Sequence, residues 1–133
     1  MANLTNVIFC LRAESVGNSV NAEGILSTLT PNYIPGLFSF SALVSILGVS
    51  AQDEHTFRIL FTSPTDESPI DISDKFVIPK YNDNLPEEYK GLNLTMNFNN
   101  IDFKVSGLYK MSVFIDGTCI GDKSIYVKGK NES

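Results

Sequence analysis

Apolar and polar residues alternate along much of this chain, with a period of two. In the stretch 92–99 (LNLTMNFN) every second residue is apolar, and the residues between them are asparagine or threonine. Successive side chains of a β-strand point to opposite faces of its sheet, so this pattern predicts a strand with one buried face. Because the spacing typical of helices is nearly absent, the sequence predicts an all-β fold.

The same test predicts strands over residues 6–13, 25–30, 37–46, 55–62, 75–78, 107–115 and 119–127 as well. With about seven or eight strands and no helix to cover a sheet, we expect an immunoglobulin-like, two-sheet antiparallel β-sandwich. We expect a single domain over residues 1–133, with its core in 6–127 and a flexible tail over 128–133. The residues predicted to share that core are Leu94, Met96, Phe57, Ile59, Val113 and Phe40.

Three stretches lack the alternation and are predicted to be loops. Residues 15–24 are rich in Gly, Asn and Ser, whereas 63–74 (SPTDESPIDISD) and 79–91 (PKYNDNLPEEYKG) are rich in proline and acids. The last two are the long loops of the expected sandwich, where binding residues often lie.

Residues 114–123 (FIDGTCIGDK) combine two acids, a thiol and two glycines, as a ligand loop could. However, Asp116-Gly117 lies between two alternating apolar runs, which is typical of a two-residue type I′ hairpin whose central residues both need positive φ. We therefore predict a hairpin turn that carries no ligand, with Gly121 at a bulge or second bend.

Charge and cysteine content restrict the function classes. The net charge is −5 and the basic residues are scattered singly, which argues against binding to nucleic acid. The apolar stretch 7–11 is too short for a signal peptide or a membrane span, so we expect a cytoplasmic protein without a membrane partner. In a reducing compartment Cys10 and Cys119 are expected to be buried thiols.

His55, the only histidine, follows two acids at the start of a predicted strand. We favour a structural or capping role for it, because a carboxylate adjacent in sequence usually points away from it in an extended segment. Only three residues are Cys or His, so a structural zinc site would need carboxylates. No glycine-rich phosphate loop occurs, and the acids of 63–74 lack the EF-hand spacing. We expect no cofactor and no metal, with calcium at the acidic loop left open.

Two surfaces are candidates for contact with another protein. Pro31 and Pro35 enclose apolar residues in a loop, which either meets a partner or folds over the open end of the sandwich. The acidic stretch is the second candidate. The candidate contact residues are Tyr33, Ile34, Pro35, Asp66, Glu67, Asp71 and Asp74.

Three segments together resemble one uncharacterised family: 20–35 (VNAEGILSTLTPNYIP), 54–61 (EHTFRILF) and 106–127 (SGLYKMSVFIDGTCIGDKSIYV). The chain is similar over nearly its whole length to small bacterial and phage-associated β-sandwich proteins that are grouped only as a domain of unknown function. The resemblance implies a fold and carries no catalytic residue onto this chain. It departs at 63–74, where relatives tend to have a tighter acidic turn.

From these observations we expect a non-enzymatic cytoplasmic binding or assembly module that acts through a loop or a sheet edge, with a protein partner or by self-association. One alternative is a small metal-dependent or hydrolytic enzyme using His55 and the acids of 66–74. Another is a structural or adaptor component of a prophage or virion.

Overall fold

The computed structural model of this protein describes residues 2–16, 19–78, 86 and 90–132, and every helix or strand element in them is a strand. None of these residues belongs to a helix with the length and apolar character needed to cross a membrane. The strands are β1 (Asn3–Val16), β2 (Ser19–Ile25), β3 (Thr28–Leu29), β4 (Gly36–Leu47), β5 (Glu54–Thr62), β6 (Ile70–Val77), β7 (Gly91–Phe103), β8 (Gly107–Ile115) and β9 (Thr118–Val127).

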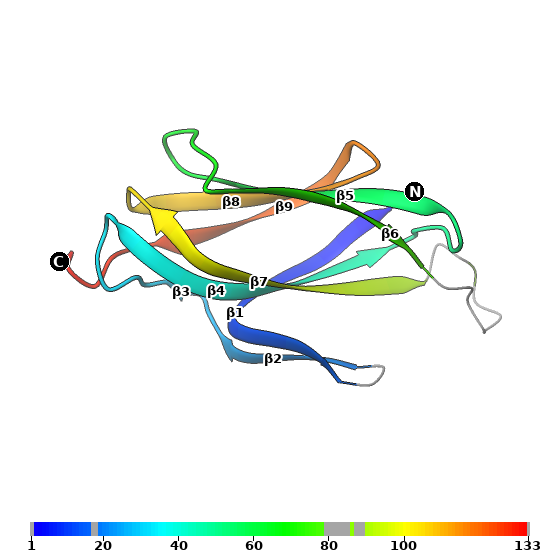
Figure 1. Cartoon of the computed structure of the whole chain (residues 1–133), viewed down its shortest axis with the longest axis horizontal. Helices are drawn as coiled ribbons and strands as arrows, with labels where there is room; N and C mark the ends of the chain where they lie inside the picture. Colours follow the sequence, from blue (N-terminus) through cyan, green and yellow to red (C-terminus); the bar gives the residue numbers. More distant parts are fainter. Residues whose placement is uncertain (1, 17–18, 79–85, 87–89, 133) are drawn as a thin grey trace.

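The strands form two sheets that lie one above the other (Figure 1). Sheet A has the order β2-β1-β4-β7, and sheet B has the order β3-β9-β8-β5-β6. The predicted two-sheet sandwich is therefore confirmed. One pairing is not antiparallel as expected, because the two-residue strand β3 pairs in parallel with β9.

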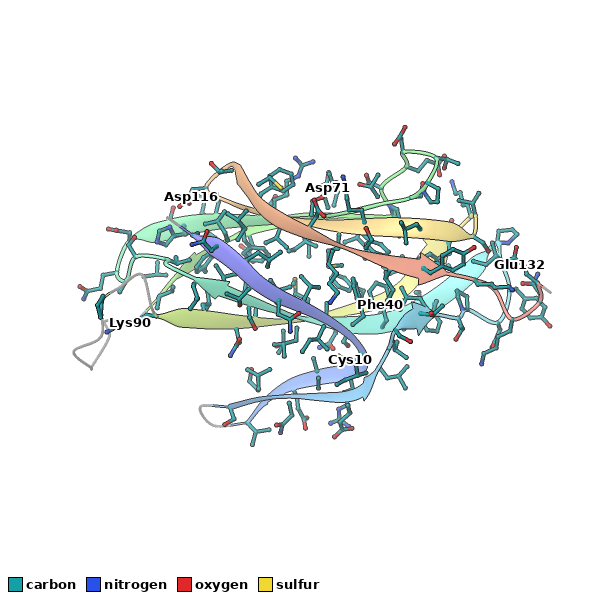
Figure 2. The ribbon with its side chains drawn as sticks, turned by 180° about the vertical axis from the view of Figure 1, so that it is seen from behind. Cys10, Phe40, Asp71, Lys90, Asp116 and Glu132 are labelled. Carbon is teal, nitrogen blue, oxygen red and sulfur yellow. The ribbon has the colours of Figure 1, made fainter. Side chains whose placement is uncertain are left out.

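The core between the sheets is aromatic at its centre. Phe40 on β4 is 1% exposed and lies between the two layers (Figure 2). Its ring centroid is 5.2 to 6.3 Å from those of five other phenylalanines, which are Phe9, Phe38, Phe61, Phe98 and Phe103. Aromatic rings at this spacing contribute energy beyond their buried area, so Phe40 joins both sheets into one core.

Three of the six residues predicted to lie in the core are fully buried. Phe40, Ile59 and Val113 are buried, as expected. Leu94, Met96 and Phe57 are only partly buried and pack against the rim of the core. Leu94 and Met96 belong to β7, the last strand of sheet A, and Phe57 lies on the neighbour of the last strand of sheet B. Because no strand of the described residues lies beyond β7, alternation predicts the inward face of Leu94 and Met96 correctly but overstates their burial.

The prediction of a loop at 15–24 is wrong, because β1 runs to Val16 and pairs with β2 from Ser19 onward. Residues 17–18 lie outside the described residues. Most of β2 is exposed, so its sequence carries no clear alternation and backbone pairing with β1 holds it in place. In the predicted strand 25–30, only Thr28 and Leu29 form a strand of their own.

The predicted edge strand at 75–78 is confirmed as an edge, but it begins earlier, at Ile70. The first residues of β6 therefore belong to the stretch predicted as the loop 63–74. Of the predicted loop 79–91, residues 79–85 and 87–89 lie outside the described residues. The expected tail is tied down where it is described, since the Lys128 and Lys130 amides donate hydrogen bonds to the Leu29 and Pro31 carbonyls.

The predicted hairpin is confirmed: Ile115 pairs with Thr118, and Asp116 and Gly117 have φ of 51° and 82° between them. The ladder shifts register between Val113 and Phe114, which makes the bulge expected beside Gly121. One prediction about thiols is wrong, because Cys119 next to this bulge is exposed, whereas Cys10 is buried.

Replacing Gly117 with valine should lower the free energy of unfolding by about 1–2 kcal/mol, because a β-branched residue resists positive φ. Apart from the two neighbouring residues, the part of the chain that the structure describes has no atom within 4 Å of the position that a Cβ would take, so backbone strain accounts for the loss. Urea unfolding measures it, with Gly117→Asn as the matched control, since asparagine tolerates this conformation. A valine variant as stable as the wild type would contradict the turn type.

Candidate functional site

His55 lies at the start of β5, 8% exposed, beside the β8–β9 turn. Its Nδ1 is 2.7 Å from Oδ2 of Asp116, and its Nε2 is 2.8 Å from the carbonyl oxygen of Ser50. The Thr56 amide donates to the other carboxylate oxygen of Asp116. The hydrogen bond to Asp116 raises the pKa of His55, with a smaller contribution from Ser50, and the same bond lowers the pKa of Asp116.

This cluster has the residue types of a hydrolase triad but not its hydrogen-bond directions. Both ring nitrogens of His55 face acceptors, so the ring is best satisfied as an imidazolium that donates from both sides. The Ser50 hydroxyl, 3.0 Å from Nε2, donates to Asp53. An imidazolium has no lone pair with which to take a proton from serine, so the geometry favours the structural role of His55.

The acids of 66–74 are spread over two places and do not meet His55. Asp66 and Glu67 follow the end of β5 opposite to His55, and Glu67 lies 3.9 Å from the Lys104 ammonium. Asp71 makes two 2.8 Å hydrogen bonds to the Arg58 guanidinium on the outer face of sheet B, and Asp74 accepts from the Lys75 amide. Figure 2 shows Asp71 and Asp116 well apart on that sheet. Among the described residues no three acids, cysteines or histidines are grouped to hold a metal ion.

The loop before β4 was expected either to contact a partner or to fold over the open end of the sandwich, and its residues are divided between the two arrangements. Ile34 packs against the core, and its amide is 3.1 Å from Oδ1 of Asn131. Tyr33 is 68% exposed, and Pro35 is exposed as well. The loop therefore closes one end of the sandwich with Ile34 and presents Tyr33 to solvent, and a protein contact through Tyr33 stays a prediction.

A further candidate lies where the two sheets end on the same side, at β6 and β7 (Figure 1). A hollow of about 440 Å³ separates these two edge strands. We call it the β6–β7 slot. Ile72, at its mouth, is 40% exposed. Its lining comes from both strands and the residue before β6. The apolar lining residues are Pro69, Ile70, Ile72, Met96, Phe98 and Ile101, and the polar ones are Asp71, Asn97 and Asn99.

From Gly91 to Phe98, before the bulge at 99–100, the edge strand β7 lacks the usual protection against pairing with another chain. Natural edges carry charges, prolines or bulges, because a row of unpaired backbone groups is otherwise a template for another strand. Residues 91–101 contain no charged residue and no proline. The other long edges differ: β6 carries Asp71, Asp74 and Lys75, and β2 carries Glu23 and a bend at Gly24, whose φ is 65°.

The pairing of β7 with β4 defines which of its backbone groups face outward. The Gly48 amide donates to the Lys90 carbonyl, and the antiparallel register continues from there through Ile46–Leu92 to Phe40–Phe98. Hydrogen-bonded pairs alternate along such a ladder. The even-numbered residues 92–98 therefore bond to β4. The odd-numbered residues 91–97 direct their N–H and C=O groups to the other side, where no strand of the described residues pairs with them.

The outer face of this edge is polar and neutral. Asn93 accepts a 2.7 Å hydrogen bond from the Ser45 hydroxyl, and Asn97 accepts one from Ser41. These bonds fix the carboxamide oxygens over β4. The sequence predicts the strand and its buried face correctly. Its position at an edge was missed, and the only signal for it in the sequence is the absence of charge over 91–101.

Comparison with known proteins gives a family but no activity. A family model described as "Family of unknown function (DUF6941)" matches residues 6–128. No curated protein matches the chain. Among solved structures, an immunoglobulin-like protein from Pseudomonas aeruginosa is 16% identical, with a TM-score of 0.45, over 96% of this chain and 97% of that chain.

Proposed function

Because the chain belongs to DUF6941, a family of unknown function, its role must come from its own surface, and we propose a non-enzymatic binding or assembly module. It pairs with another protein strand through the free edge of β7. The observation that carries this proposal is the charge-free, proline-free run 91–101 on a strand at the end of its sheet.

The β6–β7 slot supports this use of the edge. A strand added to β7 would alternate its side chains between the outer face and the slot. The side chains that entered the slot would cover Met96 and Ile72, which the protein alone leaves partly exposed. Main-chain hydrogen bonds would then supply affinity, and the apolar slot would select the side chains of the partner.

Other features support a binding role over the alternatives. His55 is occupied on both ring nitrogens, which disfavours it as a general base. The net charge of −5 disfavours a nucleic-acid partner. We also propose a cytoplasmic setting, which fits the two free thiols.

Thr95→Pro should weaken strand addition by about tenfold, because it deletes an outward N–H while leaving the β4–β7 ladder in place. The probe is a synthetic nine-residue peptide of alternating valine and threonine with a lysine at each end. The protein carries a dye on the exposed thiol of Cys119 and is kept at nanomolar concentration, so that self-association does not compete. Thermophoresis of the labelled protein measures binding.

Thr95→Val is the matched control, since it keeps both the N–H and the β-branched shape. It should bind the peptide as the wild type does, and thermal melts should show that all three proteins are folded. No binding by the wild type, or equal binding by Thr95→Pro, would contradict the proposed use of this edge.

A further inference from the structure

We infer that the strand received by β7 is β7 of a second copy of this chain, paired antiparallel about a two-fold axis at Thr95. The inference rests on the proposed function, and it adds the identity of the partner and the register.

The residue types along the edge strand β7 are arranged symmetrically about Thr95. Reading outward in both directions from Thr95, the run GLNLTMNFN has apolar residues at the first and third positions and asparagine at the second. A two-fold axis at Thr95 would therefore place Leu94 opposite Met96, Asn93 opposite Asn97 and Leu92 opposite Phe98 of the second copy. Like side chains would meet on each face, which is what an isologous interface requires.

The backbone permits this register. A hydrogen-bonded antiparallel pair needs two directly opposed residues that both direct their N–H and C=O groups outward. On β7 these are the odd-numbered residues, and a centre at Thr95 pairs odd with odd throughout. The regular run begins at Gly91 and ends at the irregularity after Phe98, where Asn100 has φ of 55°. A centre at Thr95 keeps the pairs Asn93–Asn97, Thr95–Thr95 and Asn97–Asn93 inside this run.

Charge favours a second copy at this edge over the others. Each copy carries a net charge of −5, so two copies meet with least repulsion where neither has charged residues. Pairing β7 with itself over 91–99 brings no charged side chains together. Pairing β6 with itself would gather Asp71 and Asp74 of both copies on one ribbon.

The side chains of the outer face also fit such a contact. The carboxamide oxygens of Asn93 and Asn97 accept from Ser45 and Ser41, so their amide groups are oriented before the second strand arrives. In the two-fold register each asparagine faces an asparagine of the second copy, and amide groups of this kind hydrogen-bond to one another. On the other face, Leu94 and Met96 of both copies would form an apolar row beside the slot.

A charge swap at Thr95 tests both the partner and the register, because in this register residue 95 faces itself. Sedimentation velocity of the wild type should give a species of twice 14.6 kDa. Thr95→Lys alone and Thr95→Asp alone should each weaken dimerisation by at least about tenfold, since like charges then lie directly opposite. An equimolar mixture of the two variants should recover the dimer. The control is the same pair of changes at Leu108, which is 59% exposed on sheet B, and they should leave the dimer intact.

A wild type that stays monomeric at millimolar concentration would overturn this inference, and so would variants at Thr95 that dimerise normally or a mixture that does not recover the dimer. The proposed function is decided separately by the peptide experiment. If the peptide binds at β7 while the wild type is monomeric, the edge serves a different extended segment and only the second copy is rejected.

Discussion

Replacing Phe40 with alanine should lower the free energy of unfolding by about 3–5 kcal/mol, the cost of deleting a fully buried aromatic side chain. Phe40 is 1% exposed and contacts aromatic rings from both sheets. The cavity left by the deletion would lie at the centre of the core, where β4 and its neighbours have least freedom to close it. Urea unfolding of the wild type and variant measures the loss.

Leu108→Ala is the matched control for this loss, because Leu108 is 59% exposed and its truncation should change stability by less than about 0.5 kcal/mol. Phe57→Ala should fall between the two, since Phe57 is half-buried at the rim of the core. A loss below about 1 kcal/mol for Phe40→Ala would show that the aromatic cluster does not hold the sheets together.

Asp116→Ala should lower the free energy of unfolding by about 2–3 kcal/mol near pH 6, because it leaves two hydrogen-bond donors without their acceptor. One is the Nδ1–H of the buried His55 and the other is the Thr56 amide. Chemical unfolding near pH 6 measures the loss. A variant as stable as the wild type at that pH would mean that the His55–Asp116 contact contributes nothing to stability.

The same contact makes stability depend on pH. The pKa of His55 is raised, so its stabilisation is complete below the ordinary value of about 6.5 and is lost as pH rises through the raised value. The pKa of Asp116 is lowered, so its stabilisation is present above the ordinary value of about 3.9 and is lost as pH falls through the lowered value. Stability should therefore be greatest between about pH 4 and 6.5.

Asp116→Asn separates the charge from the hydrogen bond, because an asparagine oxygen still accepts from His55 while the carboxylate is gone. In this variant the loss of stability above pH 6.5 should largely disappear. Melting temperatures across the pH range provide the comparison, and an unchanged profile would mean that another group causes the dependence.

Alternation alone was enough to predict the central strands and their inward faces, as Phe40, Ile59 and Val113 show. It failed at β2 and at the first half of β6, because edge strands are exposed and polar side chains cost little there. The expectation that Cys119 is buried failed because the bulge beside it alters the side-chain pattern.

The candidate sites were harder to predict from the sequence than the strands were. His55 and Asp116 are 61 residues apart, and only the pairing of β5 with β8 brings them together. For β7 the lack of charge is plain in the sequence, but its meaning depends on strand order. In the middle of a sheet the same run would be an ordinary buried strand, and only its place beyond β4 turns it into a free edge.

The strand order also determines which of the two sheets can form first during synthesis. Sheet A consists of β1, β2, β4 and β7, so all of its pairings are available once residue 103 has left the ribosome. Sheet B includes β3, whose pairing partner is β9, and it stays incomplete until residue 127 is made. Until then the part of the inner face of sheet A that β9 covers stays exposed, which makes the nascent chain vulnerable to aggregation just before β9 arrives.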